Sequence, residues 1–153
     1  MTAPQRRTLR FETLDEMLDD ARDVVRRPHV TVGNWTDGQI LDHLARTMNC
    51  GFDGFGFQAP LWIRLMIKPF RNGLLVKPMK SGYRLPNDAV NLQPEADVSS
   101  EDALSRFERS VERLKAEDPQ QLHPFIGRLT PEEYRRLNLR HGELHLSFIV
   151  PTE

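Results

Sequence analysis

Apolar residues recur at the three- and four-residue spacing of an amphipathic helix in four stretches of the chain. Three of these stretches open with a capping box, in which a threonine precedes a glutamate or a glutamine by three positions. The last of them also carries a proline at the first helical position, a further start signal. The pattern predicts helices near residues 13–27, 36–50, 100–117 and 130–148.

The segment between the second and third helices, residues 51–98, has no such periodicity and is rich in glycine, proline and aromatic residues. Because a structureless loop of that length is unusual in a compact domain, we expect residues 60–68 to form a short helix and the rest to pack across one end of the molecule. Four amphipathic helices with one long crossover favour an all-α fold, a four-helix bundle whose second and third helices can run parallel. The chain, residues 1–153, has no internal repeat and is expected to form a single domain.

Composition narrows the class of protein. The formal net charge is −1, which gives no electrostatic reason to expect nucleic acid as a partner. The single cysteine, Cys50, excludes an internal disulfide and suits a reducing compartment. No uncharged apolar stretch is long enough to span a bilayer. We therefore expect a cytoplasmic protein without a transmembrane segment that acts on a small-molecule substrate.

Three histidines form the strongest candidate site. His141 and His145 stand four residues apart in the fourth predicted helix, so both lie on its apolar face. His43 lies in the second predicted helix. Imidazoles from two helices can bind one divalent metal ion inside a bundle, so the sequence predicts a metal site at His43, His141 and His145. The alternative is a set of core histidines that bond to the backbone or to water.

Other polar residues near these histidines are weaker candidates. Gln39, Asn138 and Tyr134 lie beside the histidines on the same helices, where they could orient a ligand or contact a substrate, Tyr134 as an acid or a hydrogen-bond donor. Glu143 follows His141 by two positions, about 200° around the helix. We expect Glu143 to face solvent and assign it no general-base role. Cys50 is expected to be a small buried side chain and not a ligand.

Further features of the chain have looser interpretations. His29 and His123 adjoin prolines, and we expect them to be surface or loop-packing residues. The aromatic segment 52–62 is long enough to cover the histidines and exclude water. Residues 61–84 carry six basic and no acidic side chains, a composition suited either to an ordinary solvated face or to an anionic membrane surface.

The motif Asn-Trp-Thr-x-x-Gln-x-x-x-His at residues 34–43 and the His-x-x-x-His of residues 141–145 together resemble the DinB-like (YfiT-like) superfamily of metalloenzymes. Segments 52–60, 127–133 and 139–148 are similar to a bacterial branch known only as a domain of unknown function. The likeness spans nearly the whole chain.

The resemblance implies a four-helix bundle with down-up-up-down connectivity and a divalent metal, often zinc or nickel, bound by His43, His141 and His145. Characterised members use a low-molecular-weight thiol for S-transfer or isomerisation, others are metal-dependent hydrolases, and many form homodimers. The leading hypothesis is metal-dependent transfer of a thiol to a small electrophilic substrate. The alternatives are a metal-dependent hydrolase, a non-catalytic metal- or ligand-binding bundle, and a partner-binding module at a membrane surface through residues 61–84.

Overall fold

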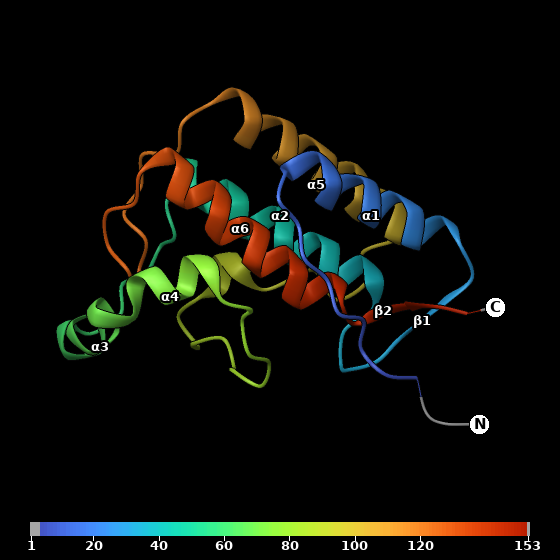
Figure 1. Cartoon of the computed structure of the whole chain (residues 1–153), viewed down its shortest axis with the longest axis horizontal. Coiled ribbons are helices and arrows are strands. Elements are labelled where there is room, and N and C mark those ends of the chain that lie inside the picture. Colours follow the sequence, from blue (N-terminus) through green and yellow to red (C-terminus); the bar gives the residue numbers. More distant parts are fainter. Residues whose placement is uncertain (1–3, 153) are drawn as a thin grey trace.

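The computed structural model describes residues 4–152, which are mostly helical and include a small two-stranded sheet. Four long helices lie side by side: α1 (Leu14–Arg26), α2 (Asp37–Asp53), α5 (Ser100–Ala116) and α6 (Pro131–Leu146). Figure 1 shows α2 and α5 running in one direction and α1 and α6 in the other. The four helices predicted from hydrophobic periodicity are confirmed, each within a few residues of its expected boundaries.

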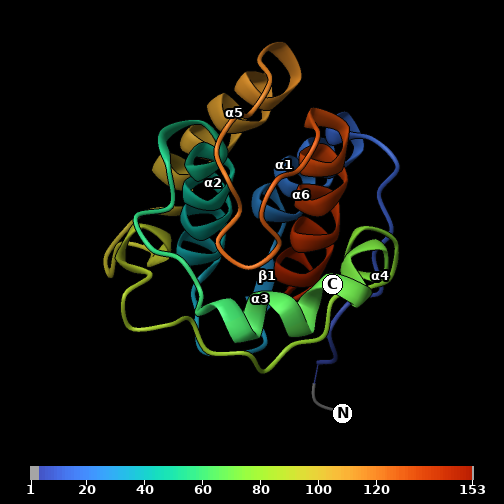
Figure 2. The same cartoon turned by 90° about the vertical axis from the view of Figure 1, so that its left-hand side faces the viewer.

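The apolar faces of these helices meet in one core. Helix α2 packs against α5 and α6, and α1 packs against the same two helices (Figure 2). The capping boxes expected at Thr13, Thr36 and Thr130 are all formed, so each helix begins where its sequence signal lies. Ile149, just after α6, is one of the largest fully buried side chains, and all four helices contribute others: Met17, Leu18, Ile40, Leu41, Leu44, Met48, Phe107, Leu114 and Leu146.

The crossover between α2 and α5 contains short helices. These are α3 (Leu61–Ile67), a 3₁₀ turn η1 (Lys68–Phe70), α4 (Arg71–Val76) and a second 3₁₀ turn η2 (Val90–Leu92). The first agrees with the helix expected at residues 60–68. Helix α4 packs on α6, and the crossover covers a second apolar cluster at one end of the molecule. Within the described residues, none of the helices is long and apolar enough to cross a membrane.

A two-stranded sheet joins the α1–α2 connection to the end of the chain. Strand β1 (His29–Thr31) pairs antiparallel with β2 (Ile149–Pro151), and Val30 faces Val150. The structure is mostly helical, as the expected all-α class requires, but this small sheet was not expected, and the fourth helix ends at Leu146, before residue 148. The run Ile149-Val150-Pro151 explains the change, because two β-branched residues followed by a proline favour extended backbone over helix.

Gly142 lets α6 approach α1 closely. A Cβ at this position would overlap the Sδ of Met17 and lie 3.2 Å from its Cγ, and Met17 is fully buried. We expect Gly142→Ala to lower the free energy of unfolding by about 1–3 kcal/mol through overpacking, although alanine is the better helix former by about 1 kcal/mol. Urea denaturation measures the change.

Gly73 provides the matched control for this substitution. It also lies in a helix, α4, but the nearest atom to a Cβ there is the Lys77 Cδ at 3.9 Å. Gly73→Ala should leave stability unchanged or raise it by up to about 1 kcal/mol. Equal effects of the two substitutions would show that the contact between α1 and α6 is not tight at Gly142.

Candidate metal centre

Helices α2 and α6 bring three histidines to one point. Each of His43, His141 and His145 offers a ring nitrogen that lies within 4.8 Å of the other two, and the Nε2 atoms of His43 and His141 are 3.2 Å apart. The ring centroids of the three pairs are separated by 4.6–5.0 Å. The expected convergence of these side chains is confirmed, and the cluster is compatible with metal binding.

A backbone carbonyl fixes the proton of His43. The Nδ1 of His43 lies 2.7 Å from the carbonyl oxygen of Leu92, in η2. Because a carbonyl can only accept, Nδ1 carries the proton and donates it. The Nε2 lone pair of neutral His43 therefore faces His141. A ring held by such a hydrogen bond is the usual arrangement of a metal-binding histidine.

Burial keeps the three imidazoles uncharged. It lowers the pKa of His43, although the Leu92 carbonyl and the nearby Asp42 carboxylate oppose the shift. Burial, with the neighbouring charges of His43 and Arg6, lowers the pKa of His145 to about 3. Burial and the other histidines hold the pKa of His141 well below its usual value. At neutral pH all three side chains are therefore in the deprotonated form that a metal ion requires.

One fully buried ring nitrogen of the cluster lacks a hydrogen bond. The Nδ1 of His141 is buried, and no hydrogen-bond partner for it lies among residues 4–152. An unpaired buried polar atom is costly in a structural core. The alternative of core histidines whose ring nitrogens all bond to the backbone is therefore not met at this atom.

Trp35 provides the aromatic cover of the histidines. Its ring stacks on His145 with a centroid distance of 5.6 Å and lies 4.9 Å from the ring of His43. Among the described aromatic contacts, no ring of segment 52–62 touches the three histidines: Phe52 packs beneath the Arg113 guanidinium, Phe55 packs on His123, and Trp62 is 63% exposed on α3. Trp35 belongs to the Asn-Trp motif, so the sequence motif could have identified this residue as part of the site.

The three weaker candidates form hydrogen bonds with the backbone. The Gln39 side chain accepts from the Thr36 N–H as part of the capping box. Asn138 donates to the Tyr134 carbonyl at 2.9 Å, and the Tyr134 hydroxyl donates to the Gln121 carbonyl. Burial raises the pKa of Tyr134 to about 12, which keeps its proton in place. None of the hydrogen bonds described for these side chains reaches a histidine.

Glu143 corrects the sequence interpretation of α6. It does not contact the histidines, as expected, but it is 5% exposed and does not face solvent. Its Oε1 accepts a hydrogen bond from the backbone N–H of Phe11 at 2.7 Å and forms an ion pair with the Arg140 guanidinium at 2.9 Å. Arg140 is buried as well and donates to the Phe11 carbonyl. The pair thus binds both backbone groups of Phe11 and holds the N-terminal segment against α6.

The remaining histidines and the cysteine lie outside the cluster. His29 lies in β1, not in a loop, with its Nε2 3.1 Å from the Asp37 carboxylate. His123 packs within its loop as expected: its Nδ1 accepts from the backbone N–H groups of Phe125 and Ile126, and Phe55 contacts its ring edge-on. Burial raises the pKa of the Cys50 thiol to about 11, which agrees with a small buried side chain.

His123 gives the protein a dependence on pH. Burial lowers the pKa of His123 to about 4, whereas an unfolded histidine titrates near about 6.5. Between these values only the unfolded chain binds the proton, so stability falls as the pH drops from about 6.5 towards 4. We expect His123→Asn, which keeps an acceptor for the two N–H groups, to remove this part of the loss. A pKa difference of one unit corresponds to about 1.4 kcal/mol. Because His123 is partly exposed, we expect its contribution to the loss of stability at low pH to stay below about 3 kcal/mol.

Urea denaturation of the wild type and of His123→Asn at pH 7 and near pH 4.5 measures the difference. A gap between the two proteins that does not change with pH would contradict the lowered pKa of His123.

Comparison with known proteins identifies a family. A family model described as "Protein of unknown function (DUF1569)" matches residues 3–152. No curated protein and no solved structure matches the chain. Because the match covers nearly the whole sequence, including all three clustered histidines, this chain belongs to the DUF1569 family.

Proposed function

We propose that His43, His141 and His145 bind one divalent metal ion, with zinc or nickel as the preferred metals. The observation that carries the proposal is the separation of 3.2 Å between the Nε2 atoms of His43 and His141. Two nitrogens bound at 2.0–2.1 Å to one tetrahedral ion lie about 3.3 Å apart. Imidazole is a good ligand for both metals.

We propose further that the four long helices form a DinB-like bundle. The parallel direction of α2 and α5, joined by the crossover, supports this, as does the placement of one histidine on α2 and two on α6 (Figure 1). The Asn-Trp…Gln…His motif adds to the resemblance, since its tryptophan contacts two of the histidines.

The activity that we propose is transfer of a low-molecular-weight thiol to a small electrophilic substrate. Structural metal sites use four protein ligands and catalytic sites use three, so a three-histidine cluster favours catalysis. A bound ion supplies a Lewis acid that activates a thiol or polarises the electrophile. The chain itself contributes neutral ligands, a fixed tautomer at His43, and the Trp35 ring that excludes water from one side. Metal-dependent hydrolysis and non-catalytic metal binding are the alternatives.

Two measurements on untagged protein test these proposals in sequence. The first is elemental analysis after exposure to a mixture of divalent metals, which should find one zinc or nickel per chain; absence of bound metal contradicts the whole proposal. The second follows the visible spectrum of the cobalt-loaded protein during addition of common low-molecular-weight thiols. A metal-loaded protein with neither a spectral change nor turnover with a generic electrophile would contradict S-transfer and leave hydrolysis or binding alone.

A further inference from the structure

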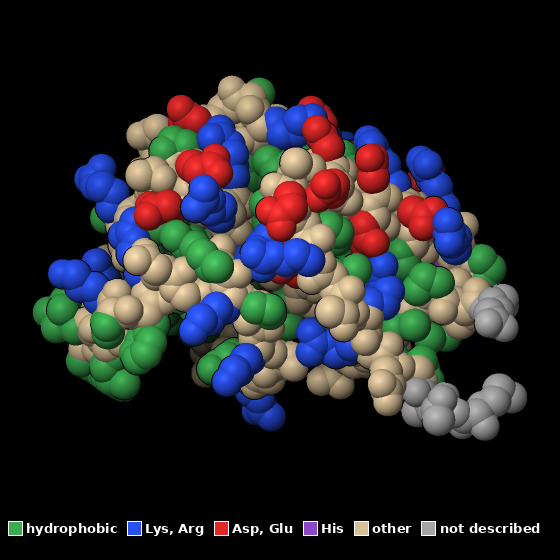
Figure 3. Space-filling view, viewed as in Figure 1, with side chains coloured by type: hydrophobic (Ala, Val, Ile, Leu, Met, Phe, Trp, Pro, Cys, Tyr) green, Lys and Arg blue, Asp and Glu red, His purple; other side chains and the backbone are tan. Residues whose placement is uncertain are grey.

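Helix α3 exposes an unusually apolar surface. Leu61, Trp62, Leu65 and Met66 on α3, and Phe70 in η1, are each 59–69% exposed, and no residue of α3 is buried. Figure 3 shows these side chains as a hydrophobic patch over α3 at the lower left. Soluble proteins rarely leave contiguous large apolar side chains in water, and such patches mark interaction surfaces.

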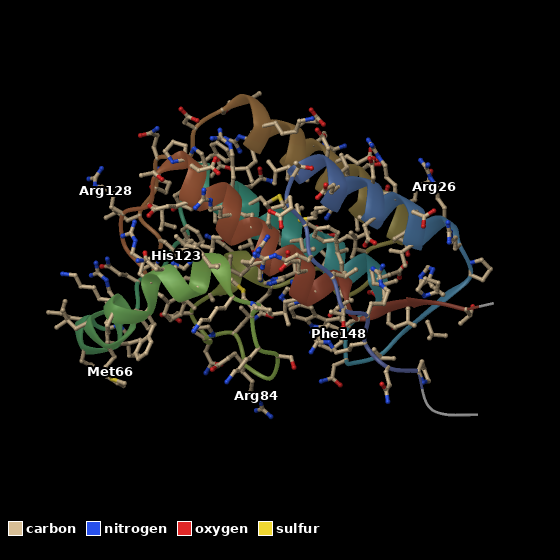
Figure 4. All side chains as sticks on the ribbon, in the orientation of Figure 1. Arg26, Met66, Arg84, His123, Arg128 and Phe148 are labelled. Carbon is tan, nitrogen blue, oxygen red and sulfur yellow. The ribbon has the colours of Figure 1, made fainter. Side chains whose placement is uncertain are left out.

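The exposure follows from how the helix is turned. Residues 61, 62, 65 and 66 lie on one face of α3, because they follow the i, i+1, i+4, i+5 spacing. The opposite face, with Ile63, Arg64 and Ile67, is partly buried against the rest of the protein. In Figure 2 α3 lies across one end of the molecule, and in Figure 4 Met66 projects from its outer edge. The helix therefore presents its most apolar face outward.

Basic side chains accompany this face. Segment 61–84 contains six lysine and arginine residues and no acidic residue. Within residues 4–152, only Arg71 of these six forms an ion pair, with Glu133. Lys68, Lys77, Lys80 and Arg84 are exposed. Figure 3 shows basic side chains along the lower edge of this view, where Figure 4 places Arg84, while the acidic side chains gather in the upper half.

We propose that α3, with the basic residues of segment 61–84, docks the protein on an anionic membrane surface. Exposed tryptophan and aliphatic side chains favour the boundary between headgroups and acyl chains, and lysine and arginine are attracted to anionic headgroups. Each basic residue near such a surface strengthens binding about fivefold. A second copy of the chain is a poorer partner for the same surface, because a two-fold interface joins the same patch of both copies and so brings two sets of basic side chains together. The proposal does not depend on the metal site.

Co-sedimentation of the full chain with vesicles tests the proposal. We expect binding to vesicles of phosphatidylcholine mixed with phosphatidylglycerol, weak binding to phosphatidylcholine alone, and loss of binding as salt is raised. Trp62→Ser/Leu65→Ser should weaken binding at least about tenfold, because both side chains enter the lipid. Lys77→Glu/Lys80→Glu should weaken it to a similar extent and reduce the salt dependence.

Val30→Ser is the matched control, since Val30 is a 38% exposed hydrophobic residue in β1, at the other end of the molecule (Figure 1). It should bind vesicles like the wild type. The Trp62→Ser/Leu65→Ser variant should keep the thermal midpoint of the wild type, since neither altered side chain is buried. Equal binding by the wild type and the α3 variant overturns the proposal. A second result would also overturn it. In that result, light scattering shows that the wild type forms a dimer through α3, which Trp62→Ser/Leu65→Ser abolishes, while the wild type does not bind anionic vesicles.

Discussion

His141→Ala is expected to lower the affinity for zinc, nickel or cobalt by more than about 100-fold. The reason is that it removes a direct ligand of the proposed metal site, and even the residues that merely orient ligands contribute about 10–100-fold to metal affinity. His145→Ala and His43→Ala should act similarly, because the three ring nitrogens lie within 4.8 Å of one another. Competition with a chromophoric chelator measures the affinity.

His29→Gln is the control for the loss of an imidazole elsewhere. His29 bonds to Asp37 and to the Arg27 carbonyl, outside the cluster. The His29→Gln variant should therefore bind metal with the affinity of the wild type. If His141→Ala and His29→Gln retain equal affinity while both remain folded, the cluster is not the metal site.

Glu143→Gln should lower the free energy of unfolding by about 3 kcal/mol. The substitution leaves the Arg140 guanidinium as a buried charge without a counter-ion, and breaking a buried pair from one side costs about 3–5 kcal/mol. A glutamine can still accept one hydrogen bond from the Phe11 N–H, so we place the effect at the lower end. Urea denaturation measures the loss, and metal content in the folded state should not change.

Glu132→Gln on the same helix is the matched control. Glu132 pairs with Arg136 across one turn of α6, and both side chains are more than half exposed. Exposed pairs of this kind contribute about 0.3–0.5 kcal/mol. A loss in Glu143→Gln no larger than in Glu132→Gln would show that the buried pair with Arg140 does not stabilise the N-terminal segment.

The long helices were predictable because their signals are local. Each of Thr13, Thr36 and Thr130 forms its capping box from residues three positions apart, so the sequence alone locates the helix start. The sheet was not predictable in the same way, because neither three-residue strand is stable alone. Strand β1 exists because β2 comes back to it from the far end of the chain.

The histidine cluster was predictable for a related reason, and the environment of Glu143 was not. Helical spacing places His141 and His145 on one face, and His43 belongs to a neighbouring helix. Glu143 lies on the other face of α6, and the surroundings of that face depend on which distant segment packs against it. Phe11 lies 132 positions from Glu143 in the sequence, and its segment converts an apparently solvent-facing glutamate into a buried ion pair.

The contact between His43 and His141 joins positions 98 residues apart, and β1 meets β2 across an even longer stretch of chain. Loops of this size must close before such contacts can form, and a structure rich in distant contacts folds more slowly than one built from local contacts. During synthesis from the N-terminus, α1, α2 and α5 all precede the His141–His145 pair. The cluster is therefore completed after these three helices, and the three histidines can come together only when residue 145 has left the ribosome.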